Sequence, residues 1–533
     1  MTHRIRARAA RGPRIVPTVE TAADKLSAFL EDAAHFPGGH APGVAFPRSE
    51  GEVAALLRTH DSLLPIGAQS SLTGGATPMG EIVVSMARMN HVVEIREETV
   101  RVEPGVSLAS LQDALEAQNL YYPPVPTFTG ATIGGTIATN AAGAATFKYG
   151  ATRPWIQALT VVLSSGDVLD LTRGGVRAHA EGYFEIDAAA GLSCVPVPPY
   201  RMPMVAKRSA GYHAEPHMDL LDLFIGSEGT LGIVTSATLK VIRRTWAPCV
   251  AFVPLSSEAG AFALTAALRD AAQTAWRTTS ADGVDIPALE YIDRRSFSLV
   301  PDRLWRRAGI RPGTDDRAAL FVQLELPLTL SLEEAHAQIA SFEQHQKTPL
   351  GRFCQILARF SAFDRTEIAL PGDRRRADLI VELREAVPAA VNEIVGHAKR
   401  TLDPSIEKVA GDVIVPFDRL DRMVAGARTA FERRGLDYAI WGHVSDGNLH
   451  PNLLPRSAAD IQAGKEAILE LGRDVTHLGG CPLAEHGVGR NAVKQTLLRQ
   501  LYGDSSIDAM RAVKRALDPE WKLAPGVLFP KTH

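Results

Sequence analysis

Hydrophobic positions in the first half of the chain recur with the spacing of short strands and amphipathic helices. Residues 49–60 and 106–118 follow helical spacing, the first behind a serine cap. The segments LLPI, EIVVSM, VVEI and VRVEPGV read as strands, and the last two are close enough to form a hairpin. ALTVVLSSGDVLDL adds two more strands around a tight turn. Because the order is not a repeated βαβ alternation, we predict an α+β fold.

A second pattern begins near residue 246, with a strand (VAFVPL), a helix over 261–274, a strand (FVQLEL) and a helix over 330–346. This is a partial match to the ferredoxin-like order of strands and helices. An amphipathic helix near the end closes at Asp518-Pro519, and we expect the extended tail behind it to return to the first domain. The proline-bearing stretch 172–206 reads as an irregular excursion.

These patterns divide the chain into four parts. They are an N-terminal arm and helix (1–45), a first domain (46–245), a second, substrate-bearing cap domain (246–500) and a C-terminal segment (501–533) that packs on the first domain. A length of 533 residues supports several cores, since single cores stop growing near ~250 to 300 residues.

Composition and charge exclude several classes of protein. The chain has 57 basic and 60 acidic residues, so nothing in its net charge of −3 draws it to nucleic acid. No apolar run approaches the ~20 residues of a spanning helix, which excludes an integral membrane protein. Four isolated cysteines suit a reducing compartment. Arginines crowd the first nineteen residues, but we favour an ordinary N-terminus over a targeting segment and expect a cytoplasmic protein, with peripheral attachment to the inner membrane as the alternative.

Two glycine-rich segments place backbone groups where chemistry can occur. In PIGAQSSLTGGATP, successive N–H groups and hydroxyls can point inward at a pyrophosphate. In GATIGGTIATNAAG, Gly134 and Gly135 would let a planar ring approach the main chain, and Asn140 would reach its polar edge. Neither segment is a Rossmann or P-loop fingerprint. Each one alone is more often a simple turn.

Histidines flank a predicted hairpin in DYAIWGHVSDGNLHPNLL. Asp446-Gly447 is the dipeptide of a two-residue type I′ turn, and such a turn would set His443 directly opposite His450. Opposed Cβ atoms lie ~4.5 to 5.5 Å apart, so both imidazoles could bind one divalent cation. Glu485, in CPLAEHGVGR, is the candidate third ligand.

Taken in order, the glycine segments, KYGATR and GYHAEPHMDLLDLFIGSEGTLGIVTSATLKV resemble the FAD-binding domain of the vanillyl-alcohol-oxidase (PCMH) type. The nearest branch resembles the group of the glycolate oxidase FAD subunit, D-lactate dehydrogenase and D-2-hydroxyglutarate dehydrogenase. The likeness runs from about residue 45 to 530 and implies a PCMH-type FAD-binding domain with a ferredoxin-like cap domain. Because the first glycine segment holds no histidine or cysteine, we expect non-covalent FAD.

The same resemblance implies a set of cofactor contacts. These are Ile66, Gly67, Ala68, Gln69, Ser70, Ser71, Leu72, Gly74, Gly75, Pro126, Thr132, Gly134, Gly135, Thr139, Asn140, Gly143, Gly150, Glu228, Gly232 and Ile233.

The segments GHVSDGNLH and EHGVG match the chemistry-bearing motifs of that group. The resemblance implies one divalent metal, equally zinc, manganese or iron, held by His443, His450 and Glu485. It further implies that His486 is the base beside the flavin and that Asn448 stands near the substrate.

Two cations match the group's positions for binding a substrate carboxylate, namely Arg384 and Lys408. The implied reaction is oxidation of a D-2-hydroxy acid resembling lactate, glycolate or 2-hydroxyglutarate by hydride transfer to flavin N5. The electrons would pass to a quinone, a cytochrome or an electron-transfer flavoprotein. A homo-oligomer is left open.

Departures from the group's pattern keep two alternatives open. The C-terminal segment reads Leu-Ala-Pro-Gly-Val over 523–527 where the group has asparagine and lysine, and the first glycine segment replaces its Arg-Gly-Gly-Gly with residues 66–69. One alternative is a flavoenzyme like alkylglycerone-phosphate synthase. The other is a non-catalytic FAD-bearing subunit of an oxidase complex, against which the intact Glu485 and His486 argue.

Overall fold

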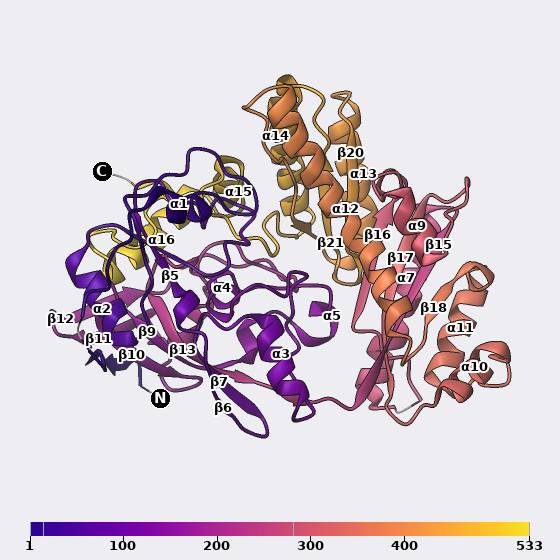
Figure 1. Ribbon diagram of the computed structural model, residues 1–533, viewed down its shortest axis with the longest axis horizontal. Coiled ribbons are helices and arrows are strands. Elements are labelled where there is room, and N and C mark those ends of the chain that lie inside the picture. Colours follow the sequence, from indigo (N-terminus) through magenta and orange to yellow (C-terminus); the bar gives the residue numbers. More distant parts are fainter. Residues whose placement is uncertain (1, 14, 281, 532–533) are drawn as a thin grey trace. The chain divides into compact units, whose positions relative to one another are not determined.

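A computed structural model describes residues 2–13, 15–280 and 282–531. The chain forms two compact units, drawn in Figure 1. The first unit comprises the chain up to Gly143, Gly150–Arg244 and the chain from Cys481 onward. The second comprises Ala144–Tyr149 and Thr245–Gly480.

Two stretches therefore belong to a different unit from the one that we predicted. Residues 481–500 lie in the first unit, because their backbone bonds to it: the N–H groups of Arg490 and Asn491 donate to Thr73 O at 2.9 and 3.0 Å. The short segment 144–149 lies in the second unit, because its side chains bond to strand residues there.

The first unit contains an antiparallel sheet and a parallel sheet (Figure 1). The larger is antiparallel and has six strands, in the order β2 (Arg8–Ala9), β10 (Asp167–Thr172), β9 (Ile156–Val162), β13 (Ile233–Lys240), β7 (Thr99–Val102) and β6 (Val92–Ile95). A parallel sheet has the order β3 (Val44–Ala45), β5 (Ile82–Ser85) and β4 (Leu63–Ile66). The predicted hairpin of VVEI with VRVEPGV is confirmed as β6 and β7.

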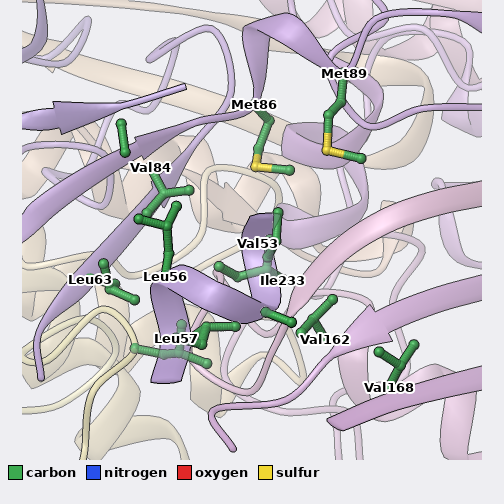
Figure 2. Packing of buried hydrophobic residues seen from close by; sticks show 13 residues of the cluster. Val53, Leu56, Leu57, Leu63, Val84, Met86, Met89, Val162, Val168 and Ile233 are labelled. Carbon is green, nitrogen blue, oxygen red and sulfur yellow. The ribbon is translucent and has the colours of Figure 1, made fainter. Parts of the chain in front are cut away.

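Helix α2 (Glu50–Thr59) holds these two sheets together. It begins where Ser49 Oγ accepts the N–H of Glu52, as its sequence predicted. Its buried face supplies Val53, Leu56 and Leu57 to a core shared with residues of β4, β5, β9, β10 and β13 (Figure 2). Full burial of each such side chain contributes roughly 1.5 to 3 kcal/mol to folding. This core holds β4 and β5, the two strands that the first glycine segment connects.

The N-terminal arm and the excursion 172–206 are more regular than predicted. β1 (Arg4–Arg6) pairs in parallel with β11 (Tyr183–Ala188), which pairs in turn with β12 (Gly191–Pro196). The sequence pattern missed this sheet because β1 has only three residues and lies far from β11 along the chain, and because only one residue of β12 is buried.

The second unit contains one antiparallel seven-stranded sheet. Its order is β18 (Glu367–Ala369), β15 (Trp246–Leu255), β17 (Ala318–Pro327), β16 (Ala288–Asp293), β20 (Tyr438–His443), β21 (Asn448–Leu453) and β19 (Val413–Ile414). The first four strands, with α7 (Glu258–Thr278) between β15 and β16, form the predicted ferredoxin-like arrangement. The remaining three extend that sheet at its β16 edge.

Long helices accompany this sheet, as Figure 1 shows for α7 and α12 beside β15 and β17. Their bounds are α10 (Leu332–Ala340), α11 (Pro349–Arg359), α12 (Arg374–Thr401), α13 (Leu420–Glu432) and α14 (Ala458–His477). No helix among the described residues combines the length and apolar character needed to cross a membrane.

The C-terminal tail returns to the first unit, as predicted. After α15 (Ala492–Tyr502) and α16 (Asp504–Leu517), the chain forms a parallel bridge to β4. Leu63 N–H donates to Lys522 O at 2.8 Å, and Ala524 N–H donates to Leu63 O at 2.8 Å. The tail thus lies along β4, the edge strand of the parallel sheet from which the first glycine segment departs.

Candidate functional site

A cavity of about 300 Å³ lies within the first unit. Both glycine-rich segments line it, together with the turn before β13. Most of the predicted cofactor residues are brought together here, namely Ile66, Gly67, Ala68, Gln69, Ser70, Ser71, Leu72, Gly75, Pro126, Thr132, Gly134, Gly135, Thr139, Glu228, Gly232 and Ile233.

Four predicted cofactor residues do not line the cavity: Gly74, Asn140, Gly143 and Gly150. Two of them, Gly74 and Asn140, have a local structural task. A Cβ on Gly74 would come within 2.6 Å of the Phe36 ring. Asn140 ends α4 (Ile133–Thr139) in the left-handed conformation, and its Oδ1 accepts the N–H of Arg153 at 3.0 Å. The structure therefore shows a packing role for Gly74 and a helix-capping role for Asn140.

Close backbone packing joins the two glycine segments. A Cβ on Gly67 would lie 2.1 Å from Oγ1 of Thr132, the residue that caps α4 by accepting the N–H of Gly135. Gln69 is left-handed at φ +51°, and its side-chain amide donates to Phe29 O at 3.0 Å. Among the described residues lining the cavity there is no lysine or arginine, so an anion here would be bound by backbone N–H groups and hydroxyls.

Glu485 and His486 also line this cavity. Nε2 of His486 lies 3.5 Å from Oε1 of Glu485, and Nζ of Lys207 lies 3.0 Å from Oε2 of the same carboxylate. The Lys207 side chain is fully buried, and we did not predict it. Its sequence neighbours carry no motif for this role, so only the fold reveals the pair.

Glu228 bonds to the turn that follows His486. Its carboxylate accepts the N–H of Val488 and that of Gly489, both at 2.8 Å. Burial raises the pKa of Glu228 to about 7, although these two hydrogen bonds act in the opposite direction. The residue is also left-handed, at φ +51°.

The histidine hairpin forms in the second unit with a different turn from the predicted one. A 3₁₀ turn over Val444–Asp446 and a left-handed Gly447 make a four-residue loop, so His443 pairs with Asn448 and His450 with Trp441. The register differs by two residues from the predicted one, in which His443 faced His450. A shift of two residues keeps both histidines on one face of the sheet. Their ring centroids are 5.4 Å apart and the rings nearly perpendicular.

Glu290 on β16 joins His443 to Arg384. Its Oε1 pairs with Nδ1 of His443, and Oε2 lies 2.6 Å from Nη2 of Arg384. Burial would raise the pKa of Glu290, but its interactions with Arg384 and His443 outweigh burial and hold that pKa well below its ordinary value. The predicted substrate cation Arg384 is thus also the partner of a buried carboxylate that the sequence did not reveal.

Asp412 is a second unpredicted carboxylate in this unit. It is fully buried, its Oδ1 lies 3.6 Å from Nδ1 of His450, and it accepts a hydrogen bond from Nδ2 of Asn448 at 3.2 Å. The predicted cation Lys408 donates to Asn392 Oδ1 at 2.8 Å. Asp412 directly precedes β19, a position at a strand end that would have been a usable signal.

Comparison with known proteins identifies the family. Residues 41–172 match the FAD binding domain, and residues 256–528 match the C-terminal domain of FAD linked oxidases. The chain belongs to the FAD-linked oxidase family. An FAD-linked oxidase of this kind is an oxidoreductase whose cofactor is FAD, and the cavity lined by the glycine segments lies in part within the matched FAD-binding region.

Relatives of this FAD-linked oxidase span nearly its whole length. It is 28% identical to glycolate oxidase subunit GlcD of Bacillus subtilis, over 92% of this chain and 89% of that protein. It is 28% identical to the D-2-hydroxyglutarate dehydrogenase of Stutzerimonas stutzeri, over 96% of each. It is 26% identical to the D-lactate dehydrogenase of Anaerostipes hadrus, over 90% of this chain and 88% of that protein.

Solved structures share its fold. A 4-ethylphenol oxidase from Gulosibacter chungangensis matches with a TM-score of 0.61 at 17% identity, over 96% of this chain and 94% of that one. An alkyldihydroxyacetonephosphate synthase matches with a TM-score of 0.57 at 16% identity, over 92% and 76%. At these identities the likeness extends to the PCMH-type architecture alone.

Proposed function

We propose that this FAD-linked oxidase is a dehydrogenase that converts a D-2-hydroxy acid to the 2-oxo acid and passes the electrons to a carrier. The observation that carries the proposal is that Glu485 and His486 line the same cavity as both glycine segments. Relatives named for glycolate, D-2-hydroxyglutarate and D-lactate support the substrate class.

The cavity fits FAD by the chemistry of its lining. Backbone N–H groups and the hydroxyls of Ser70 and Ser71 suit a pyrophosphate, and the apolar stretch near Ile233 suits a flat ring. FAD, when bound, supplies an electrophilic ring that accepts the α-hydrogen of the substrate as hydride. The first glycine segment contains no histidine or cysteine that could tether the ring, which supports non-covalent binding.

His486 is the proposed base. Its Nε2 lies 3.5 Å from Oε1 of Glu485, which orients the ring that would take the proton of the substrate hydroxyl. A positioned base of this kind contributes about 10² to 10⁴ in rate. The buried Lys207 holds the Glu485 carboxylate in place while this proton moves.

The histidine hairpin fits a divalent metal. Nδ1 of His443 pairs with Glu290, the arrangement typical of a metal-ligating histidine whose other ring nitrogen is the ligand. His450 lies beside it with Asp412. The proposed ligands are His443, His450 and Glu485, with Asp412 as an added oxygen donor. A divalent metal, when bound, lowers the pKa of a coordinated hydroxyl.

Arg384 and Lys408 remain the proposed partners of the substrate carboxylate, and Asn448 the proposed neighbour of the substrate. Because Glu290 engages Nε and Nη2 of Arg384, the guanidinium is held in a fixed orientation. Electron acceptors of the quinone, cytochrome or flavoprotein type stay open, as do the cytoplasmic location and a homo-oligomeric state.

Anaerobic mixing with matched D- and L-2-hydroxy acids tests the proposal. We expect the yellow protein to lose its flavin absorbance with D-acids and to keep it with their L-enantiomers. Acid precipitation should release FAD into the supernatant. Flavin that no 2-hydroxy acid reduces would contradict the substrate class, and flavin that stays with the precipitate would contradict non-covalent binding.

A further inference from the structure

One carboxylate connects the cofactor cavity to the turn that carries His486. Glu228 lines the cavity, and its two oxygens accept the consecutive N–H groups of Val488 and Gly489, each at 2.8 Å. Consecutive N–H groups that point to one side form a small anion-binding concavity. In this protein the carboxylate of Glu228 occupies that concavity.

The turn has the backbone conformation that this arrangement requires. Gly487 has φ +75°, and a Cβ there would lie 2.9 Å from Oε1 of Glu228. Gly489 has φ +57°, and a Cβ there would lie 2.3 Å from Thr73 O. Only glycine combines these φ values with so close an approach at both positions.

The other side of the turn bonds to the first glycine segment. The N–H groups of Arg490 and Asn491 both donate to Thr73 O, at 2.9 and 3.0 Å. Glu228 itself is fixed by its own N–H, which donates to Ala138 O at 2.7 Å in α4. The turn is therefore bonded to two walls of the cavity, and among the described residues Glu228 is the side chain that accepts the N–H groups of Val488 and Gly489.

We propose that Glu228 is a positioning residue: its carboxylate fixes the 487–489 turn and thereby holds His486 at the cavity. This role rests on the proposed function of His486 and differs from the cofactor contact predicted for Glu228. Loss of the carboxylate releases two N–H groups at the cavity wall and lets the base move. A displacement of about 1 Å costs about 10²-fold in rate.

Glu228→Ala tests this role because it leaves the two N–H groups open to the cavity. We expect the variant to retain FAD, to keep the substrate concentration for half-maximal reduction, and to lose about 10- to 100-fold in the limiting rate of anaerobic flavin reduction. Added formate, a carboxylate small enough for the vacated position, should restore much of that rate. Formamide, its neutral analogue, should not.

Glu50→Ala is the matched control. Glu50 is also half-buried in the first unit and also accepts a backbone N–H, that of Arg11 at 2.6 Å, but it does not line the cavity. The limiting rate of flavin reduction by Glu50→Ala should equal that of wild type with or without formate. A Glu228→Ala protein that reduces its flavin as fast as wild type, or whose lost rate formate does not restore, would overturn the positioning role. Wild-type flavin that no 2-hydroxy acid reduces would overturn the proposed function instead.

Discussion

Glu485 and His486 are adjacent in sequence but have different proposed tasks, so substitution can separate them. Glu485 is paired with Lys207, and its oxygen is a proposed metal ligand. His486 is the proposed base and is 23% exposed where it lines the cavity. A defect in a ligand appears in metal content at equilibrium, whereas a defect in a base appears in the rate of flavin reduction.

His486→Ala should keep FAD and metal but reduce its flavin about 10² to 10⁴ times more slowly than wild type. Glu485→Gln keeps the side-chain volume and should lose metal, because an amide is a weaker ligand than a carboxylate. Elemental analysis and anaerobic stopped-flow absorbance measure the two properties separately. An exposed histidine of the second unit, His397, offers a control whose replacement by alanine should change neither. Full-rate reduction by His486→Ala would remove it from the mechanism.

The residues that carry chemistry were predictable from sequence only where they belong to a local motif. The pairs GHVSDGNLH and EHGVG indicated His443 and Glu485. Their partners Glu290 and Lys207 lie 153 and 278 residues away and belong to no motif. Buried charges need partners, so such residues had to exist, but only the fold identifies them.

At the scale of elements, the hairpin illustrates what a periodic pattern can and cannot establish. The turn type was wrong, because the 3₁₀ turn over Val444–Asp446 replaced the two-residue turn. The prediction that His443 and His450 share a face survived, since a strand has period two and the register moved by two. A slip of one residue would have separated them.

Helix α16 is anchored by a buried ion pair that gives a pH-dependent prediction. Nζ of Lys514 bonds to Asp518, Thr230 O and Leu523 O. Burial, opposed by Asp518, lowers the pKa of Lys514 from 10.5 to about 8. Between these values the unfolded chain binds a proton that the folded chain has released, so the free energy of unfolding rises with pH.

We expect wild type to gain about 3 kcal/mol relative to Lys514→Met between pH 8 and 10.5, at 1.36 kcal/mol per pKa unit. Denaturant titrations of both proteins at several pH values measure the difference, in which other titrating groups cancel. Below pH 8, the variant should be less stable because Asp518 is left buried without its cation. A difference that stays constant from pH 8 to 10.5 would contradict the lowered pKa.

At the scale of the whole molecule, the chain passes between its two units four times, at 143/144, 149/150, 244/245 and 480/481. Chain length predicted two or three domains, and the hydrophobic pattern placed a boundary near 245, where the chain passes from Arg244 to Thr245 between the two units. The other crossings were not predictable from pattern. Segment 144–149 is too short to carry a period, and its membership in the second unit depends on polar side chains.

Those side chains make α5 (Thr146–Tyr149) a testable anchor on the second unit. The hydroxyl of Tyr149 donates to Glu325 on β17 at 2.7 Å, and Lys148 bonds to both Glu325 and Asp285. Burial raises the pKa of Glu325 while Lys148 acts against it, so this carboxylate depends on its partners. The ring of Phe147 packs 5.0 Å from that of Trp276.

Glu325→Ala should therefore release α5 and leave the cofactor cavity intact, since none of the described cavity-lining residues belongs to 144–149. Hydrogen exchange of the peptide 144–149 should become faster by about one to two orders of magnitude, corresponding to about 1 to 3 kcal/mol of lost local stability. Exchange of 66–75 and the FAD content should match wild type. Glu382→Ala is the control, because Glu382 forms an exposed ion pair with Arg307, and the loss of such a pair should leave both peptides unchanged. If the peptide 144–149 exchanged equally fast in Glu325→Ala and wild type, the Glu325 carboxylate would not be needed to hold α5. Apolar packing alone would then keep this segment in the second unit.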